Sequence, residues 1–300
     1  MELRHLRYCI AVADELNFNR AAEKLHVSQS ALSKQIRELE EEIGIEIFER
    51  TKRKVEVTEA GRLFLAEARR TLAQADQALQ IATRAGRGEI GKLVVGLEGS
   101  STYDLIPKIL HTYRSRFPHV DLIVTEMPTL QQIHALEHKH IDVGFLIQPD
   151  DLADNIECER LLREPLIVAL HQSHPLKDQS QVSLQALAKD AFVFVPQSLG
   201  CGFFSLVSQI FRSAGYTPGI IQEASQLQIL LSFVAAGMGI TLIPASARVF
   251  QMPGIVYVDL EPPAPTVDVM VAWRGDDSSP VVHAFLKIVR DNTQKQRLNT

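Results

Sequence analysis

The chain has 300 residues, of which 46% are hydrophobic and 22% are charged, and its formal net charge is −5. This composition supports two or three domains with cores of their own and excludes a disordered chain. The sequence contains no run of about eighteen apolar residues, which excludes a membrane-spanning helix. Its charged N-terminal stretch does not resemble a signal peptide, so we expect a cytoplasmic protein.

The first fifty residues predict three short helices, at 3–14, 19–25 and 28–43. Apolar residues of the last two recur at the spacings by which crossing helices bury one shared face. Only a tight corner fits between these two helices, which predicts a helix-turn-helix. In that corner His26 tolerates a left-handed backbone, and Ser28 can cap the third helix.

The third predicted helix is polar at its start and acidic at its end, where the acids gather between Glu38 and Glu42. In a helix that enters the major groove, short polar side chains of the first turn reach base edges, so we expect the acids to face away from DNA. Gln29 can form two hydrogen bonds with adenine, and Lys34 can reach guanine or a phosphate. The alternative for any one of the polar residues at the start of this helix is a solvated side chain that does not contact DNA. The predicted DNA contacts of this helix are Gln29, Ser30, Ser33 and Lys34.

Two short apolar runs around a basic turn follow and predict a β-hairpin, or wing. The turn places four cations within five residues, from Arg50 to Lys54. Residues 1–87 carry 15 Lys and Arg against 14 Asp and Glu, whereas the other 213 residues carry 16 against 22. A local basic cluster suits a polyanion because screening confines exposed charge to about 10 Å. An ordinary solvated loop is the alternative.

A long helix is predicted from Thr58 to about Arg87, which at about 1.5 Å per residue makes a rod of about 45 Å. Its apolar positions alternate steps of three and four residues, the pattern of a coiled-coil seam. Because the stripe is narrow and flanked by polar residues, it favours dimerisation over burial inside one large domain. The predicted dimerisation residues are Leu65, Ala68, Leu72, Ala75, Leu79 and Ala82.

In the remaining two hundred residues, apolar strands alternate with helices. This alternation predicts mostly parallel sheets with helices on both faces, arranged as two small α/β lobes. Folds of this kind bind ligands in a cleft, which here would lie between the lobes. The predicted strands are residues 92–97, 121–127, 142–147, 165–171, 191–196, 239–245, 255–260 and 267–273.

Motifs for catalysis or metal binding are weak. Neither a phosphate-binding P-loop nor a Gly-x-Ser-x-Gly elbow occurs. His134 and His138 have the spacing of two zinc ligands on a helix, but no convincing further ligand accompanies them. The three cysteines, Cys9, Cys158 and Cys201, form no Cys-x-x-Cys pair. We therefore expect neither an enzyme nor a bound metal or cofactor.

Motifs along the whole chain resemble the LysR-type transcriptional regulators. The strongest is the N-terminal stretch from MELRHLRYCI to KVEVTEAG, which is similar throughout to the winged helix-turn-helix of that family. Weaker motifs follow in the order LVVGLEGSS, RFPHVDLIVTE, IDVGFL, HPL and VAAGMGITLIPAS. The most similar subgroup regulates aromatic-compound and small-carboxylate metabolism.

The resemblance implies an α/β multidomain protein with an N-terminal winged helix-turn-helix, a long linker helix and a two-lobed α/β effector domain resembling periplasmic binding proteins. The implied domains are residues 1–58 for DNA binding, with the helix-turn-helix at about 18–37, residues 59–87 for the linker and dimerisation helix, and residues 88–300 for effector binding. Lobe I would span about 91–161 and 268–300, and lobe II about 162–267, joined by crossover strands near 161–165 and 264–268.

The implied function is that of a DNA-binding transcriptional regulator controlled by a small-molecule effector. Such proteins act on double-stranded promoter DNA as homotetramers, built as dimers of dimers, and RNA polymerase is a further partner that the resemblance allows. The alternative is a two-lobed solute-binding receptor or carrier without DNA function. The winged motif and the lack of an export signal argue against that alternative.

The resemblance also implies individual DNA contacts. Arg53 in the wing is similar to the family residue that enters the minor groove. Ser30 stands where the family often has proline and Lys34 where it often has arginine, so base preference should differ at these contacts. The flanking phosphates would be held by Arg50, Thr51 and Lys52.

In the effector domain, the resemblance implies that Ser100 and Thr129 hydrogen-bond the inducer between the lobes. Ser101 stands beside Ser100, and Phe203 would form a wall of the site. Free amides and the dipole at helix N-termini favour anions, which fits an acidic inducer. Helix capping by the hydroxyl groups and a core role for Phe203 are the alternatives.

One departure from the family bears on the effector. Relatives that sense aromatic acids often have arginine after the strand that corresponds to DVGF, whereas this chain has Leu146 and Ile147. A second buried charge on the ligand would then lack a partner, at a cost of several kcal/mol. We therefore expect a small monocarboxylate or a neutral polar metabolite rather than a dicarboxylate.

Overall fold

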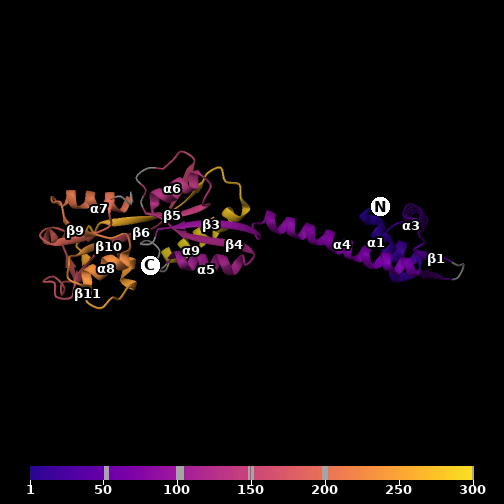
Figure 1. The fold of residues 1–300 in the computed structure, drawn as a ribbon, viewed down its shortest axis with the longest axis horizontal. Coiled ribbons are helices and arrows are strands. Elements are labelled where there is room, and N and C mark those ends of the chain that lie inside the picture. The colour runs from indigo at the N-terminus through magenta and orange to yellow at the C-terminus, as the bar shows by residue number, and fades with distance from the viewer. Residues whose placement is uncertain (51–53, 99–104, 148, 150–151, 198–201, 299–300) are drawn as a thin grey trace. The chain divides into compact units, whose positions relative to one another are not determined.

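The computed structural model describes the chain except for residues 51–53, 99–104, 148, 150–151, 198–201 and 299–300 (Figure 1). The chain divides into two compact units, Met1–Arg84 and Ala85–Thr300. Each unit has buried clusters of apolar side chains of its own. Within the described residues, no helix combines the length and the apolar character needed to cross a membrane.

The first unit is a small helical domain with a hairpin. Helices α1 (Leu3–Glu15), α2 (Phe18–Lys24) and α3 (Gln29–Ile43) enclose a core, and β1 (Phe48–Arg50) pairs antiparallel with β2 (Val55–Val57). The core is apolar because all three helices turn their buried residues towards it. Its fully buried members include Cys9, Val12, Ala21, Leu32, Ile36, Leu39 and Ile47. The predicted helix-turn-helix and wing hairpin are confirmed.

The corner between α2 and α3 has the predicted backbone. His26 lies in the left-handed region with φ of 56°, and the Ser28 hydroxyl accepts a hydrogen bond from the Ala31 amide at 3.3 Å. Asn17 caps α2 in the same way, accepting from the amides of Asn19 and Arg20. Each of these helices therefore begins with a capping side chain that satisfies one or more of its free amides and stabilises the helix.

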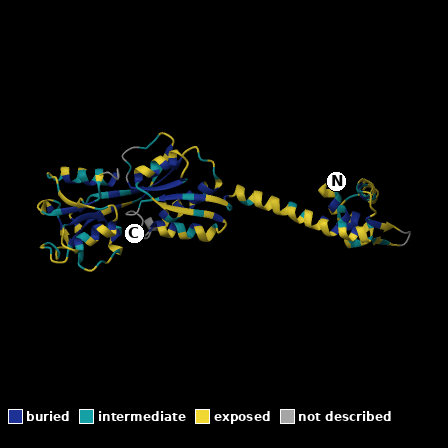
Figure 2. Cartoon of the chain, in the orientation of Figure 1, coloured by how far each residue is buried: buried dark blue, intermediate teal, exposed yellow. Residues whose placement is uncertain are grey.

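Helix α4 (Glu59–Gly86) runs without a break, as predicted. Leu65 and Ala68 are buried within the chain itself, and Leu65 belongs to the core of the first unit. Beyond them the helix is exposed along most of its length (Figure 2). This is a correction: the first two residues of the predicted dimerisation stripe belong to the domain's own interior. The stripe open to a partner begins at half-buried Leu72 and includes Leu79, which is 67% exposed.

The second unit begins with a parallel sheet. Strand β3 (Gly91–Leu97) lies between β4 (Val120–Glu126) and β5 (Val143–Ile147), and all three run parallel. The connections are helices because parallel neighbours need long crossovers. The connecting helices are α5 (Leu105–Arg116) and α6 (Thr129–Glu137). The C-terminal helix, α9 (Pro280–Leu298), packs against α5 and β3.

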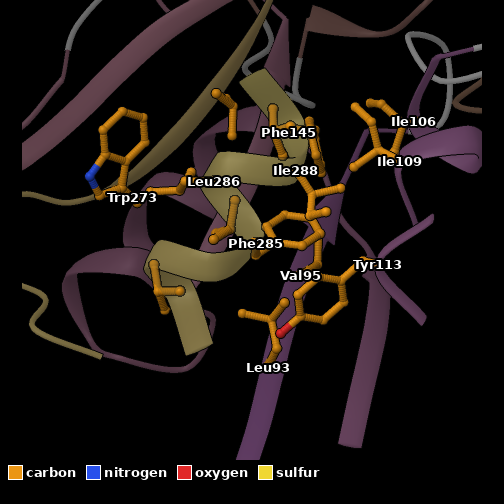
Figure 3. Close-up of a cluster of buried hydrophobic side chains, with 14 of the residues drawn as sticks. Leu93, Val95, Ile106, Ile109, Tyr113, Phe145, Trp273, Phe285, Leu286 and Ile288 are labelled. Atoms are coloured by element: carbon orange, nitrogen blue, oxygen red, sulfur yellow. The ribbon is translucent and has the colours of Figure 1, made fainter. Parts of the chain in front are cut away.

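The core of this first lobe lies between the sheet, α5 and α9. Figure 3 shows Phe285 of α9 among the labelled side chains, with its ring 5.0 Å from the ring of Tyr113 and 6.1 Å from that of Phe145. Both ring pairs meet edge to face, the arrangement that aromatic quadrupoles favour. The C-terminal helix is therefore an integral part of this lobe.

Strand β6 (Ile156–His171) is sixteen residues long and runs through both lobes. Its first half pairs antiparallel with β12 (Thr266–Arg274), and its second half pairs antiparallel with β10 (Thr241–Pro244) and β11 (Ile255–Leu260). The expectation of mostly parallel sheets is therefore wrong, because the large sheet is mixed. The prediction missed the first half of β6, whose sequence is rich in charges.

The second lobe surrounds the far half of β6. Its buried cluster joins that strand to aromatic side chains such as Phe192, Phe194 and Phe211. Two of its strands, β7 and β9, were not predicted. The remaining elements of the lobe are β7 (Gln181–Val182), η2 (Gln185–Leu187), β8 (Ala191–Phe194), α7 (Gly202–Ser213), β9 (Gly219–Glu223), α8 (Leu227–Ala235) and η4 (Ala245–Val249).

Candidate DNA-binding and effector sites

Helix α3 presents its first turn to solvent. Gln29 and Ser30 are exposed, Lys34 is exposed one turn later, and Ser33 is half-buried. Lys34 has a loose ion pair with Glu38 at 3.6 Å, and both side chains are exposed, so this pair contributes little and can open. The predicted DNA contacts on α3 are thus grouped at one accessible end of the helix.

The opposite face of α3 holds the helix in place. Leu32, Ile36 and Leu39 are fully buried in the core. Gln35 adds a polar link, since its side chain lies 3.1 Å from the His5 ring of α1 and donates to Glu38 at 2.7 Å. A helix anchored in this way can present its first turn in a fixed orientation.

Glu40, one of the acids near the end of α3, is bound to the hairpin that follows the helix. Its carboxylate accepts hydrogen bonds from the amides of Ile47 and Phe48 at 2.9 and 3.0 Å. It also pairs with Arg50, whose guanidinium lies 5.0 Å from the centre of the Phe18 ring. Arg50 is therefore engaged at the base of the wing, and a phosphate contact would compete with these bonds. The other predicted wing residues, Thr51, Lys52 and Arg53, lie outside the described residues.

In the effector domain, Thr129 is the first residue of α6 and is only 1% exposed. Its hydroxyl donates to Glu98, and its amide donates to the same carboxylate oxygen at 3.0 Å. The hydroxyl also accepts from the amide of Ile147 at 3.0 Å. Thr129 therefore has no open hydroxyl in this state. Ser100 and Ser101 lie outside the described residues.

Phe203 lies in the buried cluster of the second lobe. Its ring stacks on that of Phe194, with 5.8 Å between centroids and 20° between planes. This packing fits the core alternative better than a wall of a ligand site. Leu146 and Ile147, which stand near the position of the family's arginine, are also fully buried.

Sequence reasoning missed Glu98. This half-buried residue directly follows β3. Burial raises the pKa of its carboxyl above the ordinary value, and the hydrogen bonds from Thr129 partly oppose that rise. An acid placed straight after an apolar strand was the available signal, because a parallel strand end is where sites form.

Cys9 and Cys158 have no reactive thiol, and Cys201 lies outside the described residues. Burial raises the pKa of the Cys9 thiol to about 12 and that of Cys158 to about 11, so both are protonated and unreactive at neutral pH. The ring of His134 in α6 stacks at 4.0 Å on the ring of His138, the residue that follows this helix. Among the described residues, no group of three or more His, Cys, Asp or Glu is arranged to hold a metal ion.

Taken together, the domain with a winged helix-turn-helix and the two-lobed α/β domain define a DNA-binding regulator with an effector-binding domain. Residues 3–62 match the bacterial regulatory helix-turn-helix protein family, lysR family, and residues 86–294 match the LysR substrate binding domain. The chain belongs to the LysR family of transcriptional regulators.

Several relatives match nearly the whole chain. It is 36% identical to the HTH-type transcriptional regulator AlsR of Bacillus subtilis (strain 168) over 298 residues, which cover 99% of this chain and 97% of AlsR. It is also 36% identical to BenM of Acinetobacter baylyi over 293 residues, which cover 97% and 95%. The crystal structure of full-length CbnR with its target DNA has a TM-score of 0.84 and 29% identity, covering 98% of this chain and 100% of that one.

Proposed function

We propose that this regulator binds promoter DNA through the first turn of α3 and is controlled by a small molecule held between the two lobes of its C-terminal domain. The observation that carries the proposal is the exposed polar start of α3 on a helix whose other face is fixed in the core. The match of residues 3–62 to a DNA-binding family argues against a receptor or carrier without DNA function. We further propose that the protein acts in the cytoplasm, where promoter DNA and RNA polymerase are available, and without catalysis.

The DNA contact can be tested at Gln29. Its amide can pair with adenine in the major groove, so Gln29→Ala should weaken operator binding by about 1–3 kcal/mol and relax sequence preference. Titrations on operator and scrambled DNA measure both effects. Glu41→Gln is the matched control, since it alters an exposed side chain near the far end of the same helix. Equal operator affinity for Gln29→Ala and wild type would contradict the docking.

We propose a homotetramer, assembled as a dimer of dimers, with α4 joining two chains in each dimer. The exposed stripe of α4 supports the first contact. The second unit offers further apolar surface, because β4 is an edge strand with exposed Ile123 and Val124, and β9 exposes Ile220 and Ile221. An exposed strand edge offers unpaired backbone groups with which a second chain can pair.

For the effector, we propose a small molecule with at most one carboxylate. The buried, apolar Leu146 and Ile147 give no counter-ion for a second charge. A monocarboxylate and a neutral polar metabolite both satisfy this limit. Ser100, Ser101, Thr129 and Phe203 remain the proposed contacts, although Thr129 would first have to release Glu98, and Phe203 is buried.

A further inference from the structure

Glu98 lies at the point of the first lobe where the chain reverses its direction across the sheet. Strand β3 has β4 on one side, with Val95 opposite Val124, and β5 on the other, with Val95 opposite Val143. The chain passes from β3 to β4 and then returns past β3 to β5. Ligands of open α/β sheets bind at the carboxyl ends of the strands at such a switch point.

Three elements meet at this switch point. Glu98 follows the end of β3, Ile147 is the last residue of β5, and Thr129 begins α6. Gln132, one turn further along α6, is fully buried and donates from its side-chain amide to the carbonyls of Met127 and Phe145 at 2.9 and 3.0 Å. These hydrogen bonds hold the start of α6 against the residue that follows β4 and against β5.

Donors that would suit an anionic ligand are already used at Thr129, the first residue of α6. A helix start offers free amides and a favourable dipole to a carboxylate. At α6, however, the amide and hydroxyl of Thr129 both donate to Glu98, and the amide of Ile147 donates to the Thr129 hydroxyl. The chain thus supplies its own carboxylate to these donors.

A second carboxylate at the same point would meet a like charge in a half-buried setting. Two carboxylates that share a site repel each other, and one of them must then take up a proton. Burial raises the pKa of the Glu98 carboxyl above its ordinary value, and the hydrogen bonds from Thr129 and Ile147 only partly oppose that rise. A ligand that brings N–H or O–H donors instead would find an acceptor.

We propose that Glu98 determines the chemical class of the effector: a small neutral or cationic molecule that presents N–H or O–H donors, and not a free carboxylate. This inference rests on the proposed function, in which the effector binds between the lobes. Of the two effector classes expected from the sequence, it favours the neutral polar metabolite over the monocarboxylate. A purely structural Glu98, which only anchors α6, would alter stability but not the charge preference of the site.

The test uses full-length protein and matched pairs of small ligands that differ only in charge: isobutyrate and isobutyramide, lactate and lactamide, and benzoate and benzamide. Binding is measured by titration calorimetry and by the shift in Tm, at one neutral pH and one ionic strength. Glu98→Gln keeps an acceptor oxygen for Thr129 while removing the charge. Glu126→Gln is the control, because Glu126 is an exposed carboxylate at the end of the adjacent strand.

Wild type should bind the amide of at least one pair more tightly than its carboxylate. Glu98→Gln should shift that ratio by about tenfold or more towards the carboxylate, since it removes the like charge, and Glu126→Gln should not. An unchanged ratio in Glu98→Gln while the amides still bind, or tight carboxylate binding by wild type, overturns the inference but leaves the proposed effector control intact. If no ligand of either kind binds any of the proteins, the inference fails together with the effector site.

Discussion

Replacing Leu79 by glutamate is expected to split the proposed dimer and to lower operator affinity by about a hundredfold or more, since two linked heads gain avidity from a short tether. Leu79 lies on the exposed part of the α4 stripe and is 67% exposed within the single chain. A charge at this position therefore leaves the fold of the monomer intact while opposing helix pairing. Half-sites spaced by helical turns of DNA need both heads at once.

Light scattering and an operator titration check this result. Gln77→Glu is the matched control, because it adds the same charge to the same helix at an exposed position off the stripe. The control should keep the parent mass and affinity. A Leu79→Glu protein with the parent mass would show that α4 does not form the dimer contact.

Removing Arg274 should destabilise the first lobe by about 3–5 kcal/mol, because it leaves two half-buried carboxylates, those of Asp142 and Asp277, without the buried cation that they share. The guanidinium is almost fully buried and donates to the carbonyls of Leu136 and Ile141 at 3.1 and 2.6 Å. It also pairs with Asp142 at 3.3 Å and with Asp277 at 2.5 Å. One side chain thus connects the end of β12 with α6 and the start of β5.

The sole tryptophan, Trp273, is buried in the same lobe and reports its unfolding. Urea unfolding followed by tryptophan fluorescence should show a much lower midpoint for Arg274→Ala. Arg248→Met is the control, since Arg248 and Asp259 form an exposed pair and such pairs contribute about 0–1 kcal/mol. Equal midpoints for the two variants would show that the Arg274 network adds little stability.

Most of the fold could be predicted from local sequence patterns. The helix-turn-helix followed from apolar spacing, from His26 in the corner and from Ser28 as a cap, all of which act within a few residues. Apolar strands such as β5 were found because they are buried on both faces. Strand β9 was missed because all five of its residues are exposed.

The candidate sites could be predicted only in part, because they depend on contacts between residues that are far apart in the sequence. Glu98 and Thr129 are 31 residues apart, so only the fold shows that the Thr129 hydroxyl is occupied. The pairing of Arg50 with Glu40 likewise depends on where the hairpin meets α3. For Leu65, the heptad pattern predicted burial but could not say whether the neighbour is its own domain or a second chain.

Footprinting of the regulated promoter tests the central claim most directly, because it reports sequence-specific binding, assembly and effector control together. Wild-type protein should protect half-sites separated by about one helical turn of 10 bp or a multiple of it, as linked recognition helices require. A small neutral metabolite that presents N–H or O–H donors should change the extent or strength of this protection. Protection without sequence preference, or protection that no small molecule alters, would contradict the account.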